Sequence, residues 1–520
     1  MNMSYILDHL DVLGIVVATV VVVVGFLKWK FSYWSRLGLP TINPTIPFGD
    51  GKKLIVGEHS IGEQFEEFYE NFKARGLKHG GVHVGVKPFY IPIDPELVKH
   101  ILLKDFQHFV NRGSYIDEVN DPLSGHILSM EDNRWKNMRA KLTPTFTSGK
   151  IKMMFETLAK CSVGLKTLMD ESATNRSSID IKEILARFTT DIIGSVAFGL
   201  DCNSLKDPDA LFRKYGKKIF AATPLERVKL VLQFGVPHRV LKMFKFKATN
   251  PDVEKFFMKA VKDTVAHREK NNIYRKDFMH LLIQLKNKGA VSDDDKILNE
   301  QGKTAENGLT MNELAAQAFI FFLGGFETSA TTMTFAMYEI ATNPHVQDKL
   351  REEINTVFGK NNDQMSYDGM MKLTYMDKVL NETLRKHPPI GVITRQCSKD
   401  YTIPNTQIIL KKGIDVGIPV LGIHKDPEYY PNPETFDPER FSEENKSLRP
   451  AFTWLPFGDG PRICIGLRFG LLQSKVGLAT ILKNYKIKLS QKTKLPLTMD
   501  KQALVTTTDG GIWIEAEKIN

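Results

Sequence analysis

A cysteine in a glycine-rich loop is the side chain of this 520-residue chain best suited to hold a metal ion. The loop spans residues 457–466 and reads FGDGPRICIG, with Cys464 as its sulfur donor. Gly458 and Gly460 allow a tight turn with unhindered backbone amides around the sulfur. Gly466 lets a flat ligand approach closely. The alternative for a lone cysteine is a small, buried and inert side chain.

The residues that follow the loop indicate a thiolate. Apolar residues recur with helical spacing from Leu467 to Leu482, which places Cys464 near the positive N-terminal end of a helix. That field and the neighbouring Arg462 favour thiolate over thiol. Because a buried thiolate is costly without a cation, we expect a bound metal. Structural zinc needs three more Cys or His ligands at short spacing, which are lacking here, whereas haem iron uses a single axial thiolate.

A second chemical group lies inside a long apolar helix. A capping box at residues 310–313 (TMNE) predicts its start, and Pro344 predicts its end. Residues 324–329 at its centre read GGFETS. Paired glycines and the carboxylate of Glu327 oppose the stability of a buried helix, and such conflicts mark functional sites. A helix kink without a function is the alternative.

Together these motifs resemble a known family. The pattern F-x-x-G-x-R-x-C-x-G is the signature of the cytochrome P450 superfamily, and the longer phrase WLPFGDGPRICIG is similar to that of the microsomal insect members of its xenobiotic-metabolising group. The resemblance implies the cytochrome P450 fold, which is mainly α with small antiparallel β-sheets. It also implies haem b as the cofactor, with Cys464 as axial iron ligand and Phe457, Gly458 and Gly466 in the haem-binding loop.

The resemblance also gives the acid and the alcohol of the long helix a role. GGFETS is similar to the family's oxygen-activation motif, [A/G]-G-x-[D/E]-T-[S/T]. By that likeness Thr328 steers protons to the oxygen that is being activated, and Glu327 supplies them with the help of ordered water. Heterolytic cleavage of an O–O bond requires protons at the distal oxygen atom.

Further residues match the family's haem pocket. Two haem propionates inside a protein require charge-assisted hydrogen-bond donors. The matching donors are Trp135, Arg139, Arg395 and Arg462. In addition, Glu382 and Arg385 resemble the family's E-x-x-R pair, which joins the arginine of a P-E-R-F stretch, here Arg440. The likeness gives these three a structural role in the pocket.

The implied activity is that of a haem-thiolate monooxygenase. One atom of O2 enters a lipophilic substrate, either a xenobiotic such as an insecticide or plant toxin, or an endogenous lipid or hormone. Alternatives are a haem-thiolate isomerase that rearranges peroxides and a non-catalytic haem sensor. An apolar substrate pocket is expected from Phe319, Phe322, Phe326, Ile390, Val392 and Thr506.

The elements that must position these groups are mostly helices. Helical periodicity dominates from about residue 95 to 390, and strand-like stretches lie at residues 82–93, 393–420 and 485–514. Hydrophobic residues make up 42% of the chain, and the body contains neither a linker nor a repeat. One large catalytic domain over residues 51–520 is therefore expected.

The N-terminus is expected to span a membrane. Residues 12–27 (VLGIVVATVVVVVGFL) carry no charge and give roughly 24 Å of helix. Cations follow this stretch at Lys28 and Lys30, and acids precede it, which predicts a signal anchor over residues 1–30 with the body on the cytosolic face of the endoplasmic reticulum. A proline-rich connector, residues 31–50, leads to the body. A buried core helix is the alternative.

The charge balance limits the partners. The chain has 70 Lys+Arg against 60 Asp+Glu, a net charge of +10. Since no basic run has interleaved aromatics, nucleic acid is not expected, and the diffuse excess fits an anionic membrane or an acidic protein. Residues 227–246 mix cations with large apolar side chains and can dip into a membrane interface, or they form an ordinary amphipathic surface helix.

The electrons for the implied reaction must come from another protein. The sequence lacks a complete G-x-G-x-x-G nucleotide-binding fingerprint. The resemblance implies a separate NADPH–haemoprotein reductase with a flavin, so that NADPH acts only indirectly, and cytochrome b5 is a further candidate partner. A basic patch of Lys136, Arg468 and Lys475 is expected to dock the acidic surface of the reductase.

Overall fold

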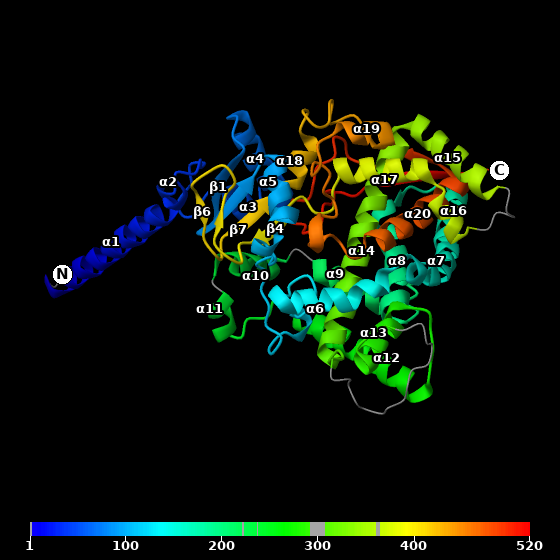
Figure 1. Cartoon of the computed structure of the whole chain (residues 1–520), viewed down its shortest axis with the longest axis horizontal. Coiled ribbons are helices and arrows are strands. Elements are labelled where there is room, and N and C mark those ends of the chain that lie inside the picture. The colour runs from blue at the N-terminus through cyan, green and yellow to red at the C-terminus, as the bar shows by residue number, and fades with distance from the viewer. Residues whose placement is uncertain (1–2, 221–222, 237, 292–306, 360–364, 520) are drawn as a thin grey trace.

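The computed structural model of the protein describes residues 3–220, 223–236, 238–291, 307–359 and 365–519. Its helices form most of the body, and one long helix projects from it (Figure 1). The helices are α1 (Met3–Phe31), α2 (Tyr33–Arg36), α3 (Lys52–Val56), α4 (Ile61–Ala74), α5 (Pro95–Lys99), α6 (Asp132–Leu142), α7 (Ser148–Thr174), α8 (Ile181–Ile193), α9 (Leu211–Phe220), α10 (Pro224–Gly235), α11 (His238–Met243), α12 (Pro251–Asn271), α13 (Phe278–Lys288), α14 (Met311–Thr342), α15 (Pro344–Phe358), α16 (Tyr367–Met371), α17 (Thr374–Lys386), α18 (Val420–Lys425), α19 (Glu443–Leu448) and α20 (Leu467–Asn484). The strands are β1 (His79–Val84), β2 (Lys87–Pro92), β3 (Ile179–Asp180), β4 (Ile393–Gln396), β5 (Tyr401–Thr402), β6 (Ile409–Leu410), β7 (Asp415–Ile418), β8 (Tyr485–Leu489) and β9 (Trp513–Lys518).

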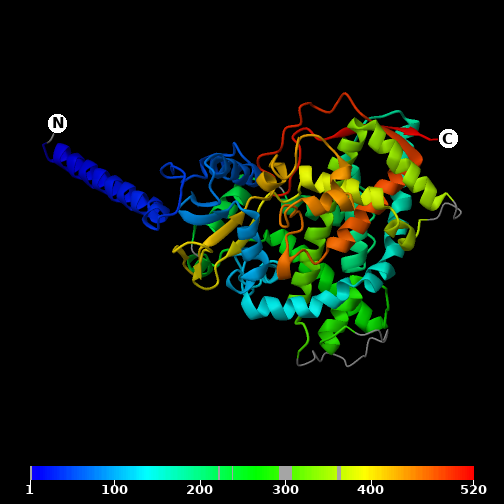
Figure 2. The ribbon, with the colours of Figure 1, turned by 45° about the horizontal axis from the view of Figure 1, so that its top comes forward.

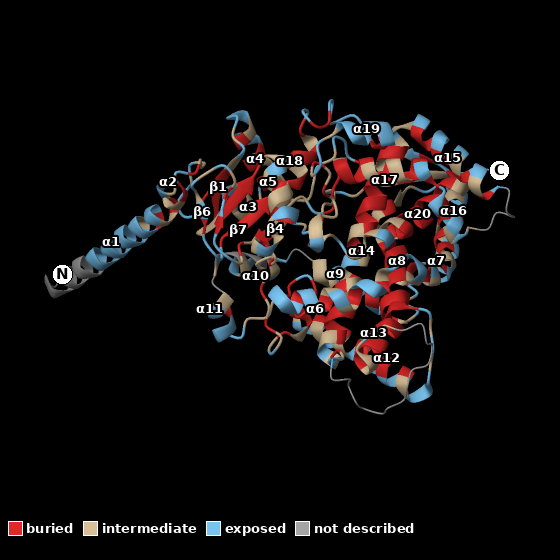
Figure 3. Ribbon diagram, viewed as in Figure 1, coloured by how far each residue is buried: buried red, intermediate tan, exposed pale blue. Residues whose placement is uncertain are grey.

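Helix α14 forms the centre of the body. It runs through the middle of the molecule and packs against α8, α12, α17 and α20 (Figure 2). The predicted capping box is confirmed: the Thr310 hydroxyl accepts a hydrogen bond from the Glu313 amide, and the Glu313 carboxylate accepts one from the Thr310 amide. Most side chains of α14 are buried (Figure 3), as expected for a helix that is apolar on all sides.

The strands form small sheets beside the helices. The largest sheet has the order β1-β2-β7-β4 and lies on the side of the body nearest α1 (Figure 1). A second sheet has the order β3-β9-β8, and a third joins β5 to β6. All these pairs are antiparallel except β2 with β7, which are parallel. The predicted fold class, mainly α with small sheets, is confirmed.

Helix α1 stands apart from the body. Leu13–Phe31 is long and apolar enough to cross a membrane, with a mean hydropathy of 2.0 and little contact with the rest of the chain (Figure 3). This fits a membrane anchor. The following segment lies on the sheet, because the fully buried indole of Trp34 donates a hydrogen bond to the Val82 carbonyl oxygen at 3.0 Å. Its ring also fills the space where a side chain at Gly81 would stand, so the connector fixes where α1 leaves the body.

Candidate functional site

The Cys464 loop has the geometry that its glycines predict. The Cys464 amide donates a hydrogen bond to the Phe457 carbonyl oxygen at 2.9 Å, which closes the loop. Gly458 and Gly460 have φ angles of +68° and +70°, in the region that favours glycine. A Cβ atom at Gly460 would also collide with the carbonyl oxygen of Leu102. The loop therefore holds the sulfur in one place, directly before α20.

The sulfur faces an open space inside the body. Cys464 has accessible surface although it lies deep inside the protein, and a Cβ atom at Gly466 would meet no atom within 4 Å. On α14, Gly324 is likewise exposed and open on its side-chain face. The two helices touch beside these residues, where Nε2 of Gln473 donates to the Gly325 carbonyl oxygen at 3.0 Å. Room for a flat group therefore lies between the start of α20 and the middle of α14.

The surroundings of Cys464 do not by themselves favour a thiolate. Burial raises the pKa of the Cys464 thiol, and the backbone amides at the start of α20, together with Arg112 and Arg139, lower it by less. Desolvation of the sulfur outweighs the nearby dipoles and charges, which agrees with the expectation that a buried thiolate here is costly without a bound cation. A thiolate at this position needs a cation bound to it, such as iron.

Buried arginines near this space have donors without partners. Arg395 on β4 is fully buried, and its Nη1 donates to the Thr394 carbonyl oxygen at 2.8 Å. Its Nε and Nη2 find no partner in the part of the chain that the structure describes, and neither does Nε of Arg462. The two terminal nitrogens of Arg462 donate to carbonyl oxygens of residues 127–130, and its guanidinium lies 4.3 Å from the ring of Trp135.

Arg112 belongs to the same cluster and was not predicted. Its Nη2 donates to the Arg462 carbonyl oxygen at 3.3 Å, and its Nε is buried without a partner among the described residues. The loop is held here because the Gln396 amide donates to the Asn111 carbonyl oxygen at 2.8 Å, next to Arg395. Burial lowers the pKa of Arg112 to about 10 and that of Arg462 to about 9. A lone arginine in a loop carries no sequence signal that marks it for this role.

These residues fit a haem. Unpaired guanidinium donors in a protein interior fit anionic groups, and the two propionates of haem are carboxylates. Arg112, Arg395 and Arg462 would hold them, with Trp135 packed on Arg462. Arg139 lies closer to the thiolate loop, where its Nη1 donates to the Ile463 carbonyl oxygen at 2.9 Å. Iron would bind to the sulfur, and the macrocycle would occupy the open space.

Replacing Arg395 tests this fit. Hydrogen bonds to charged groups contribute about 1.5–3 kcal/mol each, so we expect Arg395→Met to release haem about 10- to 150-fold faster than wild type. Arg395→Lys keeps the positive charge, so its haem release should accelerate less than that of Arg395→Met. The measurement is the rate of haem transfer to a scavenger protein. The unfolding midpoint of the haem-free protein should not fall, because the substitution removes a buried guanidinium whose Nε and Nη2 have no partner among the described residues. Unchanged haem release would contradict the assignment.

The acid and the alcohol of α14 have different neighbours. The Thr328 hydroxyl donates to the carbonyl oxygen of Gly324, one turn earlier, and so lies beside the open space. The Glu327 carboxylate instead forms an ion pair with Nζ of Lys182 on α8, at 2.7 Å. Nothing in the sequence singled out Lys182. The structure therefore adds a cation to the predicted acid–alcohol pair.

Comparison with known proteins identifies the family. The family model described as cytochrome P450 matches residues 47–514. The chain belongs to the cytochrome P450 family. It is 44% identical over 499 residues to cytochrome P450 6A1 of Musca domestica, covering 95% of both chains. It is 42% identical to probable cytochrome P450 6a14 of Drosophila melanogaster, covering 94% of this chain and 96% of the relative, and 40% identical to cytochrome P450 6a2 of the same species with the same coverage.

As a cytochrome P450, the protein is a haem monooxygenase with haem b as its cofactor and a reductase as its electron source. When bound, haem supplies the binding and cleavage of O2. Cys464 would supply the sulfur that binds the iron, and Arg112, Arg395 and Arg462 would supply hydrogen-bond donors for the propionates. This agrees with the recognition made from the loop and helix motifs.

Three predicted pocket residues of this P450 are core residues. Phe322 and Phe326 are fully buried, and Phe319 nearly so. Their rings pack among aromatic residues of α9, α12 and neighbouring segments, with Phe322 4.9 Å from Phe257 and Phe326 6.0 Å from Phe220 between ring centroids. Phe322 and Phe326 have no exposed surface and cannot line an open cavity, so the expectation is corrected for these two, whereas Phe319 keeps a small exposed surface. Because α14 is apolar on all sides, its periodicity gave no indication of which face meets the open space.

The remaining predicted pocket residues lie close together. The amide of Thr506 donates to the carbonyl oxygen of Pro389 at 3.0 Å, and its hydroxyl donates to that of Pro388 at 2.7 Å. This places Thr506 beside the segment that carries Ile390 and Val392. Ile390 is exposed and Val392 is half-buried. Both side chains therefore remain candidates for substrate contact.

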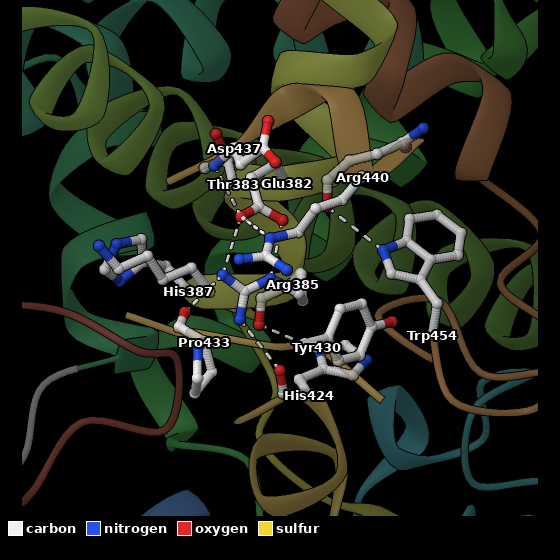
Figure 4. Close-up of polar contacts among 12 residues, drawn as sticks. Glu382, Thr383, Arg385, His387, His424, Tyr430, Pro433, Asp437, Arg440 and Trp454 are labelled. Atoms are coloured by element: carbon white, nitrogen blue, oxygen red, sulfur yellow. Dashed lines mark hydrogen bonds and ion pairs between the residues drawn. The ribbon is translucent and has the colours of Figure 1, made fainter. Parts of the chain in front are cut away.

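The E-x-x-R pair and the P-E-R-F arginine form one buried cluster (Figure 4). Arg385 donates Nε and Nη2 to the two carboxylate oxygens of Glu382 at 2.7 and 2.8 Å, and both side chains are fully buried. Nε of Arg440 lies 3.4 Å from the same carboxylate. Arg385 also donates to the carbonyl oxygens of His424 and Pro433. The cluster joins α17 to α18 and to the segment that leads to the thiolate loop.

Lys475 does not belong to the predicted basic patch. Lys475 is buried, and its Nζ donates to Asp377 at 2.7 Å and to the carbonyl oxygens of Met370 and Leu373. It points into the body because α20 turns this face toward α16 and α17, so it cannot dock a partner. Lys136 and Arg468 are exposed as predicted.

Proposed function

We propose that the protein oxidises lipophilic compounds with NADPH electrons that a separate flavoprotein, the NADPH–haemoprotein reductase, delivers. Per turnover, substrate, O2, NADPH and one proton give hydroxylated substrate, water and NADP+. The observation that carries the proposal is that α20, which follows the Cys464 loop, packs on α14 at Gly325, next to the Gly324 carbonyl oxygen to which the Thr328 hydroxyl donates. This supports a site with Cys464 on one side and Thr328 on the other.

The proposed substrates are apolar xenobiotics, such as insecticides or plant toxins, or endogenous lipids and hormones. The side chains of Ile390 and Val392 support an apolar site, and Thr506 adds one hydroxyl. We assign Glu327 and Thr328 to proton transfer, and Trp135, Arg139, Arg395, Arg462, Phe457, Gly458 and Gly466 to haem binding. We assign Glu382, Arg385 and Arg440 a structural role in the haem pocket.

The proposed electron donor docks at the thiolate side of the body. Lys136 on α6 and Arg468 on α20 are exposed cations near the Cys464 loop, and charge complementarity speeds such encounters. Cytochrome b5 is a second candidate for this surface.

We further propose that residues 1–30 anchor the protein in the endoplasmic reticulum, that residues 31–50 connect the anchor to the body, and that residues 51–520 form the catalytic domain on the cytosolic face. Cations after the apolar stretch support this orientation. Exposed apolar side chains of α10, α11 and the residue that follows α11 support a second contact with the membrane surface; they are Leu225, Val228, Leu232, Val240, Met243 and Phe244.

Thr328→Ala tests the proposed reaction. We expect wild-type protein, supplied with reductase, NADPH and a panel of lipophilic compounds, to form oxygenated products. The variant should keep its haem, but its product per NADPH should fall about 10- to 100-fold, because one positioned proton-transfer group contributes at least that much. The measurement is product and NADPH in the same assay. Intact coupling in the variant would contradict the role of Thr328, and NADPH use without product across the panel by wild type would favour an isomerase or a haem sensor.

A further inference from the structure

One polar side chain of α14 differs from its apolar neighbours. Gln317 is fully buried within residues 315–322 (AAQAFIFF), where every other side chain is apolar. A buried amide group is costly unless its donors and its acceptor find partners. Within α14 its Nε2 reaches only the Glu313 carbonyl oxygen, at 3.3 Å. The partners outside the helix therefore indicate what this side chain does.

Gln317 binds the backbone of the loop that precedes α6. Its Oε1 accepts a hydrogen bond from the Ile127 amide at 2.9 Å, and its Nε2 donates to the Gly125 carbonyl oxygen at 3.2 Å. The two bonds fix the peptide groups on both sides of residue 126. Because Gly125 and Ile127 are buried as well, water cannot readily replace these bonds.

The same loop holds Arg462. Residues 126–130 form a turn, in which the Met130 amide donates to the His126 carbonyl oxygen at 3.0 Å. Carbonyl oxygens of this turn accept hydrogen bonds from both terminal nitrogens of Arg462, whose Nε has no partner within the described ranges. A guanidinium is planar, so holding its terminal nitrogens also fixes the direction of its Nε–H bond.

The position of Gln317 on α14 relates this loop to the open space. Gly324, which is open on its side-chain face, follows Gln317 by seven residues. Residues seven apart lie on the same face of an α-helix, here roughly 10 Å from each other along the axis. The face of α14 that is open at Gly324 therefore continues to Gln317, where the loop of residues 125–130 covers it.

We propose that Gln317 is a positioning residue for haem: it fixes residues 125–130 against α14, and the carbonyl oxygens of this segment orient the guanidinium of Arg462 so that its Nε can donate to a propionate. The inference rests on the proposed haem-binding role of Arg462. It adds a residue that does not touch haem itself and that joins the arginine cluster to the central helix. Without the two bonds of Gln317 the turn shifts, and the guanidinium turns with it, because the turn carries the acceptors of its terminal nitrogens.

Gln317→Met tests the proposal in the haem-loaded protein. Methionine is similar in size but cannot pair with the two backbone groups. We expect haem to transfer to a scavenger protein at least about threefold faster than from wild type, because two buried hydrogen bonds are lost. The propionate bending bands in the resonance Raman spectrum of the ferric protein should shift. Gln317→Asn keeps the amide on a side chain one methylene shorter and should change both readouts less, so it provides the measurement if Gln317→Met does not fold.

Gln347 on α15 provides a matched control. It is also buried, and its amide binds the backbone of β8 in a similar way: Nε2 donates to the Ile487 carbonyl oxygen at 2.9 Å, and Oε1 accepts from the Ile487 amide at 2.8 Å. Gln347→Met should lower the unfolding midpoint of the haem-free protein about as much as Gln317→Met does. Its haem transfer rate and Raman bands should remain those of wild type. Equal haem transfer and equal bands in the two variants would show that Gln317 serves stability alone and would overturn the proposal.

Double variants show whether Gln317 acts through Arg462. Adding Gln317→Met to Arg462→Met should not accelerate haem release beyond that of Arg462→Met alone. Adding it to Arg395→Met should multiply the two effects, because Arg395 donates to the Thr394 carbonyl oxygen on β4 instead. A further acceleration in the Arg462→Met background would overturn the proposal while the role of Arg462 stands. Haem release from Arg462→Met at the wild-type rate would contradict the haem-binding role of Arg462 itself, so the two failures are distinguishable.

Discussion

Cys464→Ser should remove the thiolate ligand and abolish monooxygenase activity. The expected spectral result is the loss of the red-shifted Soret band that the carbon monoxide complex of a reduced haem-thiolate protein shows. A serine hydroxyl is a poor iron ligand at neutral pH and does not supply the electron density of a thiolate. Product formation should fall to background, because the sulfur is the protein's bond to the iron.

The control for this variant is Cys161→Ser. Cys161 is a free, half-buried cysteine on α7, and burial raises the pKa of its thiol to about 12. Its replacement should leave both the Soret band and the activity unchanged. An unchanged band in Cys464→Ser would exclude Cys464 as the ligand.

Glu382→Gln should be the most destabilising of the single substitutions considered. It leaves the guanidinium of Arg385 buried without a counter-charge and weakens the contact to Arg440 (Figure 4). Removing one partner of a buried ion pair costs about 3–5 kcal/mol, because the other charge remains desolvated. The loss should appear as a lower urea midpoint of the haem-loaded protein and as less protein with a thiolate-type carbon monoxide spectrum.

An exposed ion pair provides the comparison. Glu517 on β9 lies 3.3 Å from Lys488 on β8, and both side chains are more than 60% exposed. Water and salt screen such pairs, so Glu517→Gln should change the midpoint little. Equal effects of the two substitutions would show that the cluster at Glu382 is not stabilised by its buried charges.

Features that depend on a few neighbouring residues could be predicted from the sequence. The turn around Cys464 follows from glycines at fixed spacing, and the start of α14 follows from a capping box, in which the contacting groups are three residues apart. Glu382 and Arg385 are also three residues apart and meet on one turn of α17. The apolar stretch that forms α1 fits an anchor by length and composition alone.

Features that depend on how distant segments pack could not be predicted. Arg112 reaches Arg462 across 350 residues, and Lys182 reaches Glu327 from another helix. Lysine side chains usually lie at the surface, but α20 directs the Lys475 side chain into the body, where its Nζ donates to Asp377. These positions depend on which faces of the helices meet.

The sequence by itself therefore determined the reaction class, because the sulfur, its loop and the acid–alcohol pair are each encoded within ten residues. Only the tertiary structure decided which buried arginines gather beside the Cys464 loop, that Glu327 pairs with Lys182, and which aromatic side chains of α14 belong to the core. The physical reason is range: turns and caps are local contacts, whereas desolvation, ion pairing and cavities arise where elements far apart in the chain come together.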